Sequence, residues 1–287
     1  MARQVRDLGA SVRARLLTHA RDHGQPFDLV LTRFALERLL YRLSISPHAD
    51  RFVLKGAMLL TTWFADPMRP TRDIDLLGFG DPGGEAMLAT FRDILSITVD
   101  DGIKFDPEQL RVDRIREALA YGGVRLRTGA TIGGAKVPIV VDIGFGDALE
   151  PGAEKIDYPV LLGMPVPKLR AYARETVIAE KFQAMVQLGR ANTRMKDFYD
   201  IWLLSQAFEF DDDRLAGAIA ATFERRNTAI PVELPDALTT AFATDPAKIE
   251  QWNAFKRDLA VDPGTLAAAV EAIAGFLMPR ARRAAGQ

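Results

Sequence analysis

Hydrophobic residues follow a helical period in some segments of the first half of the chain and a strand period in others. Residues 8–50 carry apolar residues three and four positions apart, with a break at residues 23–26, which predicts two helices. The same period predicts a further helix over residues 85–97. Short apolar runs bounded by turn residues predict strands at 73–79, 103–105, 110–115, 124–127 and 137–143. The first half is therefore predicted to combine helices with a sheet.

The second half of the chain is predicted to be helical. Residues 147–170 contain four prolines and several glycines, which predicts a long connection. Helical periods follow over residues 174–188 and 194–206, and the remaining chain is also expected to be helical. The expected domains are an N-terminal lobe over residues 1–150 and a linker with a helical C-terminal lobe over residues 151–287.

Composition narrows the classes of function. The 287 residues include no cysteine, which excludes disulfides and thiolate metal sites and fits a reducing cytoplasm. The net charge of −1 gives no overall attraction to nucleic acid, so any RNA contact needs local basic patches. No apolar run approaches the length of about 18 residues that a membrane helix needs. We therefore expect a soluble, cytoplasmic protein with no membrane partner.

Two aspartates in the strand expected at residues 73–79 are the first candidates for chemistry. In Asp73-Ile74-Asp75 the strand period of two places both carboxylates on one face, about 7 Å apart along the strand. Isolated pairs of this kind commonly face solvent. Here apolar residues surround the pair, and ionised carboxylates are rarely buried without a partner. Because two such acids can share divalent ions, the pattern predicts a metal site.

A glycine turn lies shortly before these acids. Gly56 in Lys55-Gly56-Ala57 allows the backbone to approach a ligand closely, and a short helix is expected to follow. The free N–H groups at the start of such a helix suit a phosphate group. Lys55, Gly56 and Ala57 are therefore candidate phosphate-binding residues.

A third acid lies in a hairpin that turns at Gly133-Gly134. Asp142 belongs to the apolar strand expected at residues 137–143. In the preceding strand Arg125 and Arg127 alternate with apolar residues and share one face. Asp142 is either a strand-end residue satisfied by the following glycine turn or a third carboxylate of the metal site.

Further candidates lie in the second half. Lys181 falls within the apolar stripe of the helix expected at residues 174–188, where a lysine is uncommon. Its ammonium group either reaches the surface past its apolar neighbours or faces a cleft and meets a phosphate. In the next helix Lys196 and Asp200 are spaced for an ion pair on the helix surface.

These segments resemble a known superfamily. A glycine turn, a short helix and then Asp-x-Asp resemble the DNA polymerase β-type nucleotidyltransferases. Residues 52–57 together with residues 69–75 are similar to one branch, the AbiEii/AbiGii toxin family. The segments 142–147, 179–181 and 194–200 resemble later motifs of that family.

The resemblance implies an α+β fold, with a polymerase β-like nucleotidyltransferase lobe that has a mixed sheet and helices, followed by a helical lobe. It implies transfer of a nucleoside monophosphate from an NTP to an acceptor hydroxyl, with release of pyrophosphate. Two Mg²⁺ ions would be held by Asp73, Asp75 and Asp142, and Asp142 would accept the hydroxyl proton or help the metal to do so. The superfamily usually has Gly or Ser where this chain has Ala57, so backbone N–H groups would bind the β- and γ-phosphates there.

The later motifs imply site residues in the second lobe. Lys181, with Asp197 or Asp200, would lie across the cleft from the metal site as catalytic and NTP-binding groups. Lys196 is a further NTP-binding candidate. Which of the two aspartates is essential is left open.

The family also implies partners. Its members are the toxin halves of toxin–antitoxin or phage-defence pairs, so a cognate antitoxin is expected. Characterised members act on RNA, tRNA 3′ ends among them, which makes tRNA the favoured acceptor. The arginines at positions 69, 72, 125 and 127 favour RNA as well. The near-neutral charge favours instead a same-fold transferase acting on a small molecule or a protein, and a non-catalytic NTP-binding protein is the third alternative.

Thr71 is a candidate regulatory residue. It lies two positions before Asp73, so in extended geometry its hydroxyl shares the face of the two acids. One role is a local side-chain hydrogen bond that orders the turn at residues 69–72. The other is phosphorylation, which would add about −1.5 to −2 charges beside the metal carboxylates and silence the enzyme.

Overall fold

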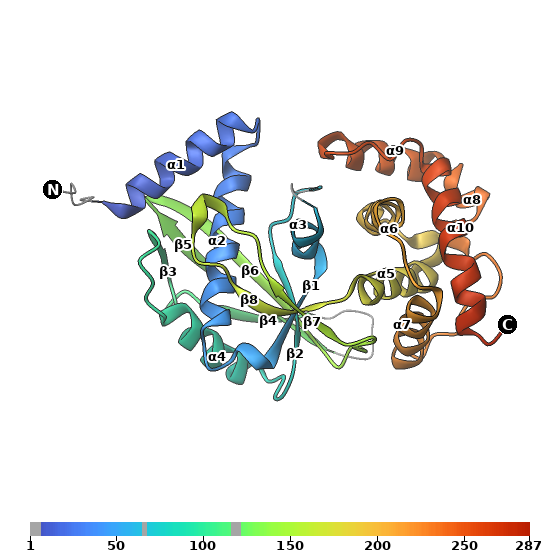
Figure 1. Ribbon diagram of the computed structural model, residues 1–287, viewed down its shortest axis with the longest axis horizontal. Coiled ribbons are helices and arrows are strands. Elements are labelled where there is room, and N and C mark those ends of the chain that lie inside the picture. Colours follow the sequence, from blue (N-terminus) through green and yellow to red (C-terminus); the bar gives the residue numbers. More distant parts are fainter. Residues whose placement is uncertain (1–6, 65–67, 116–121) are drawn as a thin grey trace. The chain divides into compact units, whose positions relative to one another are not determined.

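Figure 1 shows the computed structural model, which describes residues 7–64, 68–115 and 122–287. The helices in chain order are α1 (Leu8–Asp22), α2 (Phe27–Ser44), α3 (Leu60–Trp63), α4 (Gly84–Ser96), α5 (Arg174–Leu188), α6 (Met195–Ala207), α7 (Asp212–Arg225), α8 (Thr240–Ala243), α9 (Pro246–Phe255) and α10 (Leu266–Ala284). The strands are β1 (Phe52–Lys55), β2 (Ile74–Gly78), β3 (Ile103–Phe105), β4 (Arg111–Ile115), β5 (Gly123–Ile132), β6 (Ala135–Phe145), β7 (Ala153–Asp157) and β8 (Lys168–Tyr172). The 3₁₀ turn η2 (Gly56–Leu59) directly follows β1, and the 3₁₀ turn η3 (Leu161–Gly163) lies between β7 and β8.

The described residues form two units. The first is built from residues within 1–66, 70–146 and 155–171, and it contains α1 to α4 and most of the sheet. The second is built from residues within 67–69, 147–154 and 172–287, and it contains α5 to α10. The domain boundary predicted at residue 150 stays a prediction.

The sheet has the strand order β3-β5-β6-β2-β1-β8-β7, with β4 paired to β5 beside this path. β2 runs parallel to β6 and antiparallel to β1, and β1 runs parallel to β8. β5 and β6 form an antiparallel hairpin, and both glycines of its Gly133-Gly134 turn have positive φ, as a tight turn requires. A mixed sheet with helices confirms the predicted α+β fold class.

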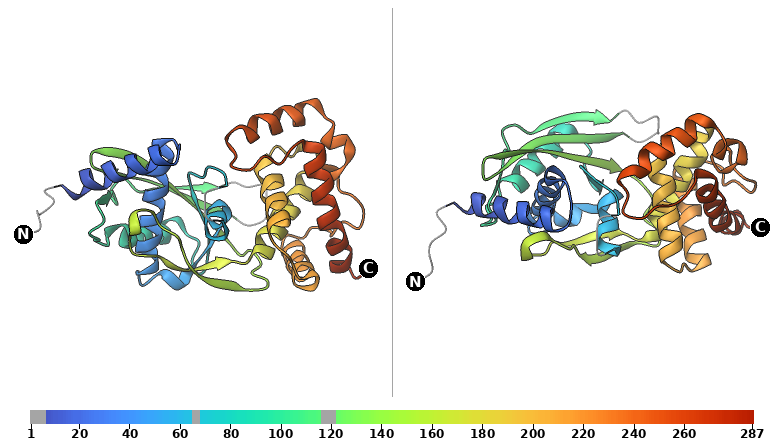
Figure 2. Two further views of the ribbon diagram at one scale, coloured as in Figure 1. Left: turned by 45° about the horizontal axis from the view of Figure 1, so that its top comes forward. Right: turned by 90° about the horizontal axis from the view of Figure 1, so that it is seen from above.

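The helices of the first unit cover one face of the β5–β6 hairpin. In β6 the odd-numbered residues from Val137 to Ile143 are buried, and the even-numbered residues between them are half-buried or exposed. α2 packs against β6, and α4 packs against β4. The sheet curves around α2, as both views in Figure 2 show. α2 is therefore buried on nearly all sides, which explains why apolar residues occur all round it.

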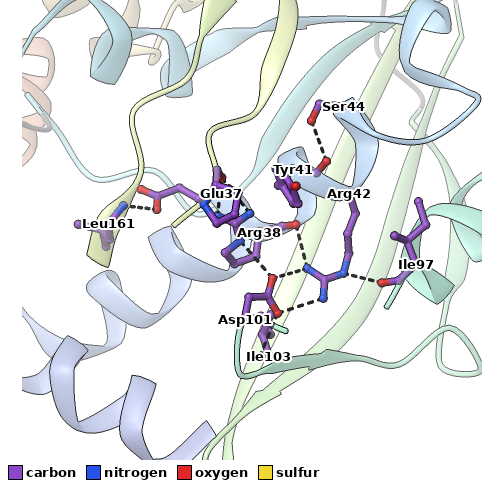
Figure 3. A network of polar contacts seen from close by, with 10 residues as sticks. Glu37, Arg38, Tyr41, Arg42, Ser44, Ile97, Asp101, Ile103 and Leu161 are labelled. Atoms are coloured by element: carbon purple, nitrogen blue, oxygen red, sulfur yellow. Dashed lines mark hydrogen bonds and ion pairs between the residues drawn. The ribbon is translucent and has the colours of Figure 1, made fainter. Parts of the chain in front are cut away.

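The curved sheet also encloses charged residues of α2, and these are paired. Asp101 accepts hydrogen bonds from Arg38 Nε at 3.1 Å and from Arg42 Nη1 at 2.7 Å (Figure 3). Arg38 also donates to the carbonyl of Pro165 at 3.0 Å. Glu37 accepts a hydrogen bond of 2.8 Å from a backbone N–H of η3 (Figure 3). These bonds tie α2 to the loop before β3 and to the segment between β7 and β8.

The prediction of a long connection over residues 147–170 is wrong. β7 and most of β8 lie in this stretch and extend the sheet beyond β1. The four prolines lie outside both strands, so none of them removes a donor from the ladder. The strands have only five residues each, and the side chains of β7 show no buried face. The prolines and glycines between and beside the strands therefore dominate the local pattern.

The second unit is helical, as predicted. Its largest helix contacts are between α5 and α7, between α7 and α10, and between α6 and α10. The aromatic side chains of Phe182 and Phe223 meet between α5 and α7, with ring centroids 5.3 Å apart. Within this unit, Arg226 forms ion pairs with Asp147 at 3.0 Å and with Glu180 at 3.3 Å.

Among the described residues, no helix combines the length and the apolar character that crossing a membrane requires.

Candidate active site

Five charged residues form one row across the sheet of the first unit. The strand register pairs Lys55 with Asp75, Asp75 with Asp142, and Asp142 with Arg125. Arg125 is paired in turn with Asp113 of β4. Residues in register on neighbouring strands share a face, so all five side chains project from the same face. The helices pack against the buried face of β5 and β6, and the charged row lies on the opposite face.

A carboxylate cluster lies in the middle of this row. Asp73, Asp75 and Asp142 each present an oxygen atom, and these atoms lie within 4.8 Å of one another. All three residues are half-buried. Two ligands on opposite sides of Mg²⁺ are about 4.2 Å apart, because each Mg–O distance is about 2.1 Å. A donor set of carboxylates alone suits a hard divalent cation, so the residues present fit the predicted metal.

Arg125 is a member of the site that the sequence analysis did not assign. Its guanidinium donates to both oxygens of Asp142, from Nε at 2.7 Å and from Nη2 at 2.6 Å. The hydrogen bond to Asp142 and the charges of the other two acids raise the pKa of Arg125, so this arginine stays charged. A carboxylate has about four lone-pair sites, so Asp142 can accept both bonds and still bind a metal. The Gly133-Gly134 turn could have revealed this pair. Counting residues outward from the turn along both strands places Arg125 of β5 opposite Asp142 of β6.

Position 56 requires a glycine for two reasons, which are its backbone conformation and the close packing of Asp75. Its φ of +74° lies in the left-handed region that favours glycine. A Cβ atom added there would lie 2.0 Å from Asp75 Oδ2 and 2.7 Å from Asp75 Cβ. The space that a side chain would need is therefore filled by a carboxylate of the cluster. The short helix predicted after Gly56 consists of η2 and the single turn of α3.

Gly56→Ala should reduce nucleotide transfer by about tenfold or more, since displacing a positioned catalytic group by about 1 Å can cost that much or more. The measurement is the rate of label transfer from NTP, with thermal unfolding to show that the variant folds.

Gly134→Ala is the matched control, because Gly134 has a φ of +81° and nothing within 4 Å of an added Cβ. This variant should be less stable, because alanine rarely adopts a positive φ, but its rate of nucleotide transfer should stay unchanged. Equal rates in the two variants would contradict the collision with Asp75.

Lys181 lies inside an ion-pair cluster of the second unit. Its ammonium nitrogen lies 2.7 Å from Asp197 Oδ1 and 2.8 Å from Asp200 Oδ2. Asp200 also accepts two hydrogen bonds from Arg69, at 2.7 Å from Nε and 2.8 Å from Nη2. The side chain of Lys181 is only 12% exposed, so the alternative in which it reaches the surface is wrong.

The cluster keeps its charges in spite of its burial. Burial lowers the pKa of Lys181, but Asp197 and Asp200 outweigh this effect and the pKa is raised. Burial would likewise raise the pKa of Asp200, but Lys181 and Arg69 hold it well below its ordinary range. Lys181 therefore remains an ammonium ion whose charge is balanced by carboxylates of its own unit.

Two expectations about neighbouring charges are corrected. The predicted ion pair between Lys196 and Asp200 is wrong, because Asp200 is buried against Lys181 and Arg69 while Lys196 is exposed. Arg69 was expected to favour RNA, but its side chain is 8% exposed and is committed to Asp200. Arg72, by contrast, makes an exposed ion pair with Asp28 at 2.9 Å.

Lys181→Met should lower the free energy of unfolding by about 1–3 kcal/mol, because it removes the ammonium donor of the buried Asp197 Oδ1. Thermal unfolding measures this loss. The double variant Lys181→Met/Asp197→Asn removes one charge of each sign and should recover part of it. A single variant that melts like the wild type would contradict the structural role of this cluster.

Thr71 makes the local hydrogen bond that was one of its two predicted roles. Its hydroxyl donates to Asp73 Oδ1 at 3.1 Å, and the main-chain oxygen of Asp73 lies at 3.4 Å. The hydroxyl is therefore beside the carboxylate cluster, as extended geometry predicts.

Comparison with known sequences identifies one family. The sequence model of the family described as "Nucleotidyl transferase AbiEii toxin, Type IV TA system" matches residues 38–275 of this chain. Among curated proteins, no sequence matches.

Two solved structures from Helicobacter pylori are similar in fold. The crystal structure of JHP933 aligns with a TM-score of 0.51 at 16% identity, over 89% of this chain and 94% of that chain. A second structure, of a protein provisionally assigned as a nucleotidyltransferase, aligns with a TM-score of 0.51 at 17% identity, over 88% of this chain and 96% of that chain. At such identities the likeness shows a common fold.

Proposed function

The chain belongs to the AbiEii nucleotidyltransferase toxin family of type IV toxin–antitoxin systems, and from this premise we propose that its acceptor is RNA, with the tRNA 3′ end favoured. The enzyme is a nucleotidyltransferase, its substrate is an NTP, and its family implies an antitoxin partner. We further propose a cytoplasmic location, because NTPs and tRNA occur there. The observation that carries the proposal is the cluster of Asp73, Asp75 and Asp142 with its added arginine.

In the proposed reaction a hydroxyl oxygen of the acceptor bonds to the α-phosphorus of the NTP. The bond from this phosphorus to the α–β bridging oxygen breaks, and pyrophosphate leaves with the electron pair. The hydroxyl proton passes to a carboxylate, for which Asp142 is the candidate. Asp73 and Asp75 would hold the divalent metal together with Asp142, and we propose Mg²⁺ in two positions. When bound, the metal would lower the pKa of the hydroxyl and neutralise the leaving group.

The candidate NTP-binding residues have different support. Lys55 is in register with Asp75, and it directly precedes Gly56 and Ala57, so these three would meet a triphosphate bound at the cluster. Lys181, Asp197 and Asp200 bind one another, so we propose that they fix α5 against α6. Lys196 is exposed and stays a predicted NTP contact.

The test is transfer from each α-labelled NTP, one at a time, to total tRNA. We expect label on tRNA, loss of transfer in EDTA, and recovery when Mg²⁺ is restored. Periodate-oxidised tRNA, whose 3′-terminal diol is destroyed, should accept no label. Label on protein or on a small molecule, or NTP binding without transfer, would contradict the RNA proposal.

We also propose that phosphorylation of Thr71 silences the enzyme, because the phosphate would stand where Thr71 now meets Asp73. Thr71→Glu should reduce transfer by about tenfold or more because it places a negative charge beside the carboxylates, whereas Thr71→Val should keep most of it because valine has a similar shape and adds no charge. Both rates are measured with the tRNA assay. A fully active Thr71→Glu enzyme would count against this switch.

A further inference from the structure

The face of the sheet that carries the carboxylate cluster continues along the β5–β6 hairpin as an exposed, basic surface. Arg127 and Arg111 are in register two residues beyond Arg125, and both are exposed. Farther along the hairpin, Thr131 is in register with Lys104 of β3 and with Lys136 of β6, and all three are exposed. The face therefore carries two basic rows beyond the row of the cluster.

Most of these cations are available for a ligand. Among the residues that the structure describes, no carboxylate forms an ion pair with Lys104, Arg111 or Lys136. Arg111 donates to the backbone carbonyls of Glu108 and Leu110, at 2.9 Å each. Arg127 pairs with Asp113, but both side chains are about half exposed, at 51% and 54%. An exposed pair of this kind is worth at most about 1 kcal/mol, so an anion can take over the arginine.

The strip between the two basic rows is flat. Gly129 of β5 is in register with Pro138 of β6 on the same face. An added Cβ at Gly129 would have only the carbonyl oxygen of Val137 within 4 Å, at 3.9 Å. A ribose or a base can therefore lie on this strip without meeting a large side chain.

The basic rows lead directly to the cluster. At about 3.4 Å per residue, Arg127 lies about 7 Å along β5 from Arg125, and Thr131 lies about 20 Å from it. A strand of nucleic acid that follows β5 over this distance would bring its end to the carboxylates. All of these residues belong to the first unit.

We propose that the exposed face of β3, β4, β5 and β6 is a track for the sugar–phosphate backbone of the RNA acceptor, with Lys104, Arg111, Arg127 and Lys136 as the phosphate contacts. The inference rests on the proposed function and deepens it. Lysine and arginine are the side chains that bind phosphates in such complexes, and the contacts carry no sequence information. With a net charge of −1 for the chain, a local track is what binding to RNA requires.

The first experiment removes charge from the track. Lys104→Gln/Arg111→Gln/Lys136→Gln replaces three exposed side chains, so the fold should persist. Binding of fluorescein-labelled tRNA is measured by anisotropy over a range of salt concentrations, and binding of Mg²⁺-NTP is measured by calorimetry. We expect tRNA affinity to fall by about tenfold or more and the slope of log K against log salt to fall by about two to three, with NTP affinity unchanged.

The matched control removes the same charge elsewhere in the same unit. Arg92 of α4, Lys155 of β7 and Lys168 of β8 are exposed, and their triple replacement by Gln should change tRNA affinity less than about twofold. Equal losses in the two triple variants, or no loss in the track variant, would overturn the track while leaving the proposed function intact. A wild-type enzyme that transfers to another acceptor and binds no tRNA would overturn both.

A second measurement does not depend on charge. Because the chain has no cysteine, Thr131→Cys creates a single attachment point for a photo-crosslinker on the track. We expect this variant to crosslink to tRNA, and Arg92→Cys on α4 to crosslink at background level. Background crosslinking from both positions would overturn the track.

Discussion

Asp75→Asn should reduce nucleotide transfer by about 100- to 1000-fold, the loss expected when one main electrostatic stabiliser is removed. Asp75 belongs to the charged row, in register with Lys55 on one side and Asp142 on the other. Asparagine keeps the shape of the side chain but removes the negative charge that a divalent cation requires. The half-buried position of Asp75 should allow the variant to fold, because no core volume is lost.

Three measurements decide this prediction. Label transfer to tRNA should fall, Mn²⁺ affinity followed by electron paramagnetic resonance should fall with it, and the unfolding temperature should change little. Asp113→Asn is the matched control, because Asp113 stands at the end of the same row and is 54% exposed beside Arg127. Wild-type turnover by a folded Asp75→Asn enzyme would remove the metal assignment for this residue.

Two members of the carboxylate cluster, Asp73 and Asp75, could be predicted from sequence with two short-range rules. The strand period of two places Asp73 and Asp75 on one face, and their apolar neighbours indicate that the strand is buried. The hairpin turn and the resemblance to a family then brought in Asp142. Arg125 was missed as a partner because its role depends on register, which the sequence analysis did not count outward from the turn.

The Lys181 cluster shows what a helical pattern cannot supply. The apolar stripe of α5 places Lys181 on a buried face, and that part of the prediction needs only local spacing. Asp200 pairs with Lys181 and also with Arg69, which lies 131 residues away in the sequence. The nearby Lys196 was predicted instead, because an i, i+4 rule considers only residues of one helix. Asp200 is buried, and a buried carboxylate needs close donors, so it pairs with buried cations and not with the exposed Lys196.

The strands β7 and β8 were missed for a different reason. β7 is the edge strand and β8 lies between it and β1, and strands of only five residues gain much of their stability from the strand they join, which is not visible in the local sequence. β8 alternates buried Leu169 and Ala171 with more exposed residues, which was a usable signal. The neighbouring prolines obscured it, because prolines beside a short run are also typical of loops.

Asp101→Ala should lower the free energy of unfolding by about 3–5 kcal/mol, the usual cost of removing one partner from a buried charge pair. The side chains of Asp101 and Arg38 are 0% exposed, and that of Arg42 is 3% exposed. Burial lowers the pKa of Arg38, and the charge and hydrogen bond of Asp101 oppose this effect. Without Asp101, the buried guanidinium groups of Arg38 and Arg42 would lose the carboxylate that both of them bind (Figure 3), although they would keep hydrogen bonds to the carbonyls of Pro165 and Ile97.

Thermal and urea unfolding measure the loss, and Asp100→Ala is the matched control because Asp100 is exposed. Replacing the triad by apolar residues, as Arg38→Met/Asp101→Leu/Arg42→Met, should recover much of the stability, since an apolar core avoids the desolvation of three charges. The recovery should be incomplete, because the carbonyls of Ile97 and Pro165 would lose their donors. If Asp101→Ala unfolds like the wild type, the network does not hold α2 within the curved sheet. If the apolar variant is stable but transfers nucleotides slowly, the network instead serves to position the sheet that carries the carboxylates.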